Sequence, residues 1–195
     1  PTADFITHCF LPTIEKIGIQ VDFHCERAGF FPIGAGQIQT TIHPWIQQTK
    51  YTASDKGQLI STHAYAAALN IPTDIADREL ETLHNKLDLS TRKRLNFKGI
   101  SQGNTAYVIL NYEQHQQVFS ALGEMKKSAE KVAHDLSKEV KAYLESEAVA
   151  DEYLADQLLL PLALGKGGEF TAKVISEHTK TQAEMIQKFI DCDIQ

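Results

Sequence analysis

The sequence predicts a protein of the α/β (α+β) class, because helical and strand patterns alternate along the chain. Apolar residues recur at helical spacing over Ala3–Ile17, and apolar and polar residues then alternate over Ile19–Cys25, as in a half-buried strand. A long strand pattern followed by a helix covers Leu59–Leu87. A strand pattern at Thr105–Tyr112, with a further short one at 118–122, precedes an amphipathic helix at Ser128–Glu145.

Length and composition place the chain among ordinary globular proteins. Its 195 residues can form one large domain or two small ones, and 43% hydrophobic with 23% charged residues is unremarkable for that class. A net charge of −6 disfavours a broad surface that coats nucleic acid, but it is compatible with a short contact to an RNA end.

Targeting signals and cysteine usage indicate where the protein works. The sequence shows neither a signal-peptide pattern nor an apolar run long enough for a membrane span. Its three cysteines lack a C-x-x-C spacing, which favours reduced thiols over a zinc site or disulfides. We therefore expect a cytoplasmic protein, or a nuclear one in a eukaryote. The chain opens on Pro1 and enters its first helix at once, so we also expect it to be part of a longer protein.

A glycine-rich loop at Arg27–Ile38 leads into a second strand pattern that ends at Ile42. Gly34 and Gly36 allow backbone conformations that side chains forbid. The loop could turn a β-hairpin or cradle a phosphate, but a phosphate loop is normally followed by a helix N-terminus and none is predicted here. The pattern therefore favours a structural hairpin.

A basic segment follows the helix that ends near Leu87. It contains Arg92, Lys93, Arg94 and Lys98 within a few residues of one another. Such a cluster is usually a solvated surface, and contact with a phosphate backbone is the less common alternative.

Polar residues share one face of a leucine-rich helix that begins after Asp151. Tyr153, Asp156 and Gln157 stand at i, i+3 and i+4, and we expect the helix to be buried nearly all round. A buried carboxylate and amide need partners. They either form a hydrogen-bond network or line a nucleotide or metal pocket, with Tyr153 available for stacking and Asp156 for a cation or ribose.

His178 stands just ahead of a further predicted helix. Thr181 and Glu184 form a capping-box pattern, which predicts a helix from about Gln182 to about Ile190. A helix N-terminus attracts phosphate oxygens, and a histidine held there could attack phosphorus in covalent catalysis. A lone histidine is more often structural, so the spacing alone leaves both interpretations open.

Several segments resemble the RNA 3′-terminal phosphate cyclase family. They are Y-L-A-D-Q-L-L-L-P-L-A-L, G-G-E-F-T and E-H-T-K-T towards the C-terminus, P-T-A-D-F-I at the start, and the loop G-F-F-P-I-G-A-G-Q-I. The loop departs from the family signature at Ala28, where a basic residue is usual, and at Ala35, where glycine is usual. The family's N-terminal third, with phosphate-binding arginines and a metal-associated glutamate, has no counterpart in this sequence, and neither do its last strands.

The resemblance implies an architecture and a reaction. A large domain of repeated α/β units would comprise residues 1–55 and 149–195, and a smaller α/β domain would be inserted at 56–148. The implied enzyme is an ATP-dependent ligase active in RNA processing. It converts an RNA 3′-terminal phosphate to a 2′,3′-cyclic phosphate through a covalent histidine–AMP intermediate, with ATP and a divalent cation (Mg²⁺ or Mn²⁺) as cofactors.

The resemblance also assigns residues by position. His178 would be the nucleophile, Tyr153 would stack on adenine, and Asp156 and Gln157 would lie near the nucleotide or metal. The other residues that the resemblance places in this pocket are Pro1, Asp4 and Phe5.

The implied partners are RNA 3′-phosphate ends, ATP and the N-terminal portion of the same protein; a homo-oligomer stays open. Two alternatives remain. Some cyclase-like proteins lack the nucleophile and act in rRNA processing or ribosome assembly, and the presence of His178 favours the enzyme. An enolpyruvyl transferase has a similar repeated α/β fold, but E-H-T-K-T weighs against it.

Overall fold

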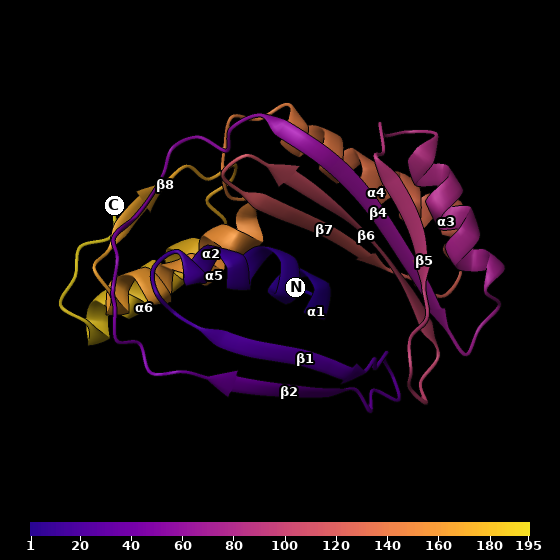
Figure 1. Cartoon of the computed structure of the whole chain (residues 1–195), viewed down its shortest axis with the longest axis horizontal. Coiled ribbons are helices and arrows are strands. Elements are labelled where there is room, and N and C mark those ends of the chain that lie inside the picture. The colour runs from indigo at the N-terminus through magenta and orange to yellow at the C-terminus, as the bar shows by residue number, and fades with distance from the viewer.

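A four-stranded sheet is the centre of the computed structural model, which describes residues 1–195 (Figure 1). Its strands are β4 (Leu59–Leu69), β5 (Thr91–Leu95), β6 (Gly103–Tyr112) and β7 (Gln116–Leu122), in the order β5-β4-β6-β7. β4 and β5 are parallel, and the other neighbours are antiparallel. The predicted α/β class is confirmed.

Two helices, α3 (Asp74–His84) and α4 (Ala129–Leu144), cover one face of this sheet (Figure 1). Both are amphipathic, and α4 begins where Ser128 accepts a hydrogen bond from the Lys131 N–H. Their buried stripes form the first core with alternate residues of β4, β6 and β7. This core includes Leu136 of α4, Ala66 of β4 and Val108 of β6.

The N-terminal helix contains a π-turn that the sequence pattern did not predict. It runs as α1 (Ala3–Phe5), η1 (Ile6–Phe10) and α2 (Leu11–Glu15). Leu11 donates its N–H to the Ile6 carbonyl, and Pro12, which has no N–H, follows at once. The wider turn relieves the clash that a proline ring makes with the preceding helical turn.

The predicted hairpin is confirmed as β1 (Val21–Arg27) paired with β2 (Gln37–Ile42). The intervening loop turns through Gly34 and Ala35, which have φ angles of 65° and 58°. Alanine tolerates this left-handed conformation less well than glycine, so the departure from the family signature at Ala35 is accommodated with some strain.

The C-terminal part consists of α5 (Glu152–Leu164), β8 (Gly168–Phe170) and α6 (Glu177–Phe189). β8 pairs in parallel with β3 (Tyr51–Ala53). Two expectations about the helices are corrected. α6 begins at Glu177, not near Gln182, and α5 is not buried all round, because Leu160 and Leu164 are exposed.

A second core joins the N-terminal helix and α5 to the other face of the sheet. Its buried residues include Phe5 and Cys9 from the N-terminal helix, Leu154 and Leu158 from α5, and Tyr107 from β6. The central sheet is therefore packed on both faces. The division into a large domain and an inserted one at 56–148 stays a prediction. None of the helices is both long and apolar enough to cross a membrane.

Candidate active site

The helix that carries three of the predicted site residues is fixed at its start by Asp151. Asp151 Oδ1 accepts a hydrogen bond from the Leu154 N–H at 2.8 Å, which caps α5. The carboxyl group is buried, and burial raises the pKa of Asp151 to about 6, although hydrogen bonding from Leu154 and Gln117 opposes the shift. The start of α5 is therefore anchored inside the protein.

Buried polar groups from other elements surround this cap. Gln117 of β7 is fully buried, and its Oε1 accepts from the Cys9 thiol at 3.7 Å and lies 3.2 Å from Nε2 of His115. Burial lowers the pKa of His115 to about 4, which keeps this imidazole neutral near pH 7. The network connects the N-terminal helix, β7 and α5.

Beyond the cap, the three predicted residues lie on α5. Tyr153 is 52% exposed, so its ring is accessible for stacking, while Asp156 and Gln157 are half-buried. With the Gln182 amide oriented so that its nitrogen faces α5, it donates to the Asp156 backbone oxygen at 2.5 Å and to Oδ1 at 2.7 Å. Asp156 therefore ties α5 to α6.

His178 lies in the first turn of α6, and its side chain is exposed. The helix starts at Ser176, whose Oγ accepts from the Thr179 N–H at 3.1 Å, and Glu177 pairs with Lys180 at 2.6 Å. The predicted position near a helix N-terminus is thus retained although the boundary moved. The field at this end favours anions, and phosphates in particular.

The remaining predicted residues are at the start of the chain. Pro1 is exposed, whereas Phe5 is 2% exposed and packs in the second core with Leu154 of α5. Asp4 is half-buried beside Tyr107; burial raises its pKa, and nearby His8 and the Tyr107 hydroxyl oppose the shift. The structure therefore places α1 in the same core as the start of α5, and the role of these residues in a nucleotide pocket stays a prediction.

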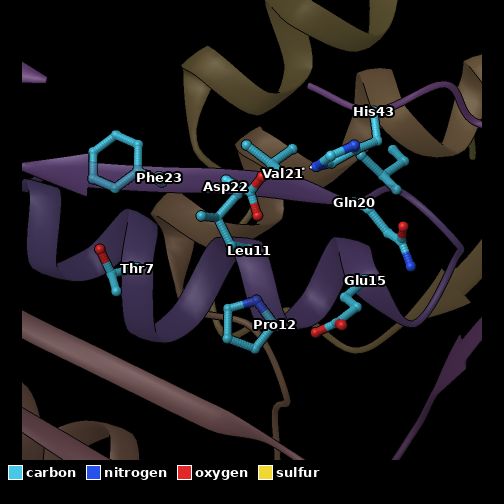
Figure 2. Close-up of a pocket in the computed structure, with 10 residues that line it drawn as sticks. Thr7, Leu11, Pro12, Glu15, Gln20, Val21, Asp22, Phe23 and His43 are labelled. Atoms are coloured by element: carbon cyan, nitrogen blue, oxygen red, sulfur yellow. Dashed lines mark hydrogen bonds and ion pairs between the residues drawn. The ribbon is translucent and has the colours of Figure 1, made fainter. Parts of the chain in front are cut away.

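Two cavities lie near the elements that carry these residues. The first, of about 580 Å³, lies between the N-terminal helix and β1, where His43 Nε2 is 2.8 Å from Asp22 Oδ2 (Figure 2). It contains none of the predicted residues, and the Asp22 and His43 side chains are both well exposed. We therefore interpret it as a surface groove beside the hairpin.

The second cavity, of about 970 Å³, is lined by α5, β8, α6 and the last residues of the chain. Ala155 and Thr179 line it, and each is adjacent in sequence to a predicted site residue, Asp156 and His178. The space beside the predicted site is therefore the larger of the two. No group of three or more His, Cys, Asp or Glu residues is arranged to hold a metal ion.

Three positions in this region were missed by sequence reasoning. Asp151 precedes a leucine-rich helix and is a preferred N-cap residue type, so a capping rule would have found it. Gln117 and Gln182 gave no local signal, because their partners on the N-terminal helix and α5 are distant in sequence.

Comparison with known proteins shows the family of the chain. The family model described as RNA 3′-terminal phosphate cyclase matches residues 1–195. A curated protein of Koribacter versatilis (strain Ellin345), named RNA 3′-terminal phosphate cyclase, is 38% identical over 193 residues. The match covers 97% of this chain and 54% of the relative, so the chain spans about half the length of that protein. The chain belongs to the RNA 3′-terminal phosphate cyclase family.

Proposed function

We propose that this chain carries the nucleophile and one wall of the nucleotide pocket of an ATP-dependent RNA 3′-terminal phosphate cyclase. The observation that supports this most is the position of His178, an exposed imidazole in the first turn of the 13-residue helix α6. α6 is joined to α5 through Gln182 and Asp156, so the nucleophile and the proposed pocket wall have a fixed relation.

In the proposed first step, a ring nitrogen of His178 attacks the α-phosphorus of ATP. A nitrogen–phosphorus bond forms, the bond to the bridging oxygen breaks, pyrophosphate leaves, and the proton on the other ring nitrogen passes to solvent. Free N–H groups in the first turn of α6 would stabilise the charge that develops on the transferring phosphate.

In the proposed second and third steps, AMP moves to the RNA and is then released. An oxygen of the RNA 3′-phosphate displaces His178 from phosphorus and forms a phosphoanhydride. The adjacent 2′-hydroxyl then attacks the RNA phosphorus, loses its proton, expels AMP and closes the 2′,3′-cyclic phosphate. Tyr153 would hold adenine by stacking, which orients the α-phosphate towards His178.

A divalent cation is part of the proposal, but the residues of this chain give it no complete site. No cluster of three suitable ligands is present, and the Asp156 carboxylate is within 2.7 Å of the Gln182 amide. Mg²⁺ is commonly held by substrate phosphates with one or two carboxylates, and Asp156 is the carboxylate of this wall that could contribute. The cation would supply charge neutralisation of the triphosphate.

Covalent labelling tests the function. The protein, expressed at its full natural length, is incubated with ATP carrying a labelled α-phosphate. We expect acid-labile, alkali-stable labelling, as for a phosphoramidate, and loss of the label to background in His178→Asn. His84→Asn, which changes another exposed helical histidine, is the matched control and should label normally.

Equal labelling of His178→Asn and the unaltered protein would exclude His178 as the nucleophile. If the unaltered protein takes no label under conditions in which it binds ATP and RNA, the non-catalytic alternative, a cyclase-like protein acting in rRNA processing or ribosome assembly, would be favoured instead.

A further inference from the structure

Four side chains form a row across the central sheet, on the face that α3 and α4 do not cover. Lys93 of β5 is opposite Tyr65 of β4, Tyr65 is opposite Tyr107 of β6, and Tyr107 is opposite Ser120 of β7. Directly opposite residues on neighbouring strands project from the same face. The Tyr65 and Tyr107 rings are stacked, with centroids 5.0 Å apart and an interplanar angle of 21°.

The alternation of β5 divides the basic segment between the two faces of the sheet. Arg92 and Arg94 turn towards α3, where they pair with Glu81 at 2.5 Å and Asp77 at 2.7 Å. Lys93, between them, projects to the opposite face, is exposed and forms no ion pair. Among the three cations of β5, the one left without an acidic partner is therefore Lys93, which is opposite Tyr65.

The two ends of the row differ in accessibility. At the β7 end, Ser120 Oγ accepts from Thr2 Oγ1 at 3.3 Å, and Tyr107 is buried with the His8 ring stacked 6.5 Å away. At the β5 end, Lys93 is exposed and Tyr65 is only partly buried. In Figure 1 this face of the sheet is turned towards the N-terminal helix and the β1–β2 hairpin.

Helix α1 connects the row to the proposed nucleotide pocket. Asp4 lies beside the Tyr107 hydroxyl, and the next residue, Phe5, belongs to the same buried core as Leu154 of α5. A nucleic acid strand whose end lies at α5 and α6 could therefore pass α1 and continue along the row to Tyr65 and Lys93.

We infer that this row binds single-stranded RNA upstream of its 3′-terminal phosphate, with a base stacked on Tyr65 and a backbone phosphate paired with Lys93. The inference rests on the proposed function, which makes an RNA end the substrate. An aromatic ring beside an unpaired cation is the arrangement by which proteins hold single strands without reading their sequence. One such contact agrees with the net charge of −6, which disfavours a broad basic surface.

Fluorescence anisotropy with a labelled single-stranded RNA of about twelve nucleotides that ends in a 3′-phosphate tests the inference, because this length exceeds one binding platform. We expect Tyr65→Leu to weaken binding by about tenfold, the loss of one stacked base, while Tyr65→Phe binds like the unaltered protein. Lys93→Gln should reduce the slope of log Kd against log salt concentration by about 0.7, the value for one phosphate contact on a single strand.

Lys141→Gln is the matched control for charge. Lys141 is an exposed lysine of α4, on the other side of the sheet, and its removal should leave the salt slope unchanged. If Tyr65→Leu destabilises the fold, as a thermal melt would show, Lys93→Gln decides the question because that side chain is exposed.

Unchanged affinity in Tyr65→Leu together with an unchanged salt slope in Lys93→Gln would overturn the inference. Labelling of His178 by ATP requires no RNA, so it tests the proposed function separately. Normal His178 labelling with no effect of the sheet variants would reject only the RNA row, whereas absent labelling with intact effects of these variants would reject only the catalytic proposal.

Discussion

The two faces of the central sheet are built differently. The face under α3 and α4 is closed by a core of apolar side chains, with Glu79 buried beside it and other charges at the surface in pairs such as Arg78–Glu130. The opposite face packs the N-terminal helix and α5, whose Cys9 and N-cap residue Asp151 share a buried polar network with Gln117 of the edge strand β7. Buried polar groups stabilise less than apolar ones but fix geometry through their partners. The first face therefore serves stability, and the second serves the position of α5.

Truncating one leucine on each face gives the largest expected effect. Leu136 of α4 and Leu154 of α5 are 1% and 0% exposed, and Leu→Ala at either site should lower the free energy of unfolding by about 2–5 kcal/mol. Only Leu154→Ala should also reduce labelling of His178 by ATP, measured at a temperature where both variants are folded. If folded Leu136→Ala lost labelling to the same extent, the two faces would not be functionally distinct.

Neutralising Glu79, a buried carboxylate of α3, should stabilise the protein. Glu79 is fully buried, with Oε1 accepting from Asn104 Nδ2 at 2.5 Å, and burial raises its pKa from 4.5 to about 7. Because the folded-state pKa is raised, its contribution to stability is present below pH 4.5 and is lost as the pH rises to 7. In urea denaturation, the free energy of unfolding of Glu79→Gln should therefore exceed that of the unaltered protein by about 3 kcal/mol at pH 8 and differ little from it at pH 4.

Equal effects of Glu79→Gln at pH 4 and pH 8 would show that the charge of Glu79 does not limit stability. Gln keeps the oxygen that accepts from Asn104, so the variant changes the charge with little change of shape.

Periodicity was sufficient to predict most elements, because their apolar faces are encoded locally. The helix at Ala129–Leu144 and the strand at Gly103–Tyr112 are confirmed for this reason. β5 was not predicted, since Thr91–Leu95 has almost no apolar residues and its strand conformation depends on pairing with β4. The start of α6 was misplaced because Ser176 and Thr181 are both suitable N-caps. Only the Ser176 start gives the turn that buries Thr179.

The site was predicted less completely than the fold. Helical spacing placed Tyr153 and Asp156 on one face, and the resemblance supplied the interpretation of His178 as a nucleophile. The network around Asp151 could not be predicted as a whole, because Cys9, His115 and Gln117 meet it only after the N-terminal helix and β7 pack against α5.

A substitution at Asp151 has the smallest expected effect and tests most specifically the sheet face that packs α5, here called the polar face. Its pKa of about 6 exceeds the ordinary value of 3.8, so its contribution to stability is lost as the pH rises between these values. His115 acts in the opposite sense, because its pKa is lowered from 6.5 to about 4 and its contribution is lost as the pH falls through that interval. The pH dependences of stability that Asp151 and His115 contribute therefore largely cancel in the unaltered protein.

Asp151→Asn should separate these two contributions. Asn keeps an oxygen that accepts from the Leu154 N–H and removes the buried charge, so we expect about 2 kcal/mol more free energy of unfolding at pH 8, after allowing for the lost interaction with the helix dipole. The gain should vanish near pH 4, and the difference from the unaltered protein should grow between pH 4 and pH 6. Asp151→Ala, which lacks the cap, should be about 1 kcal/mol less stable than Asp151→Asn. If Asp151→Asn were instead destabilised at pH 8 by as much as Asp151→Ala, the carboxylate charge itself would be needed to hold α5, and the polar face would contribute stability as well as geometry.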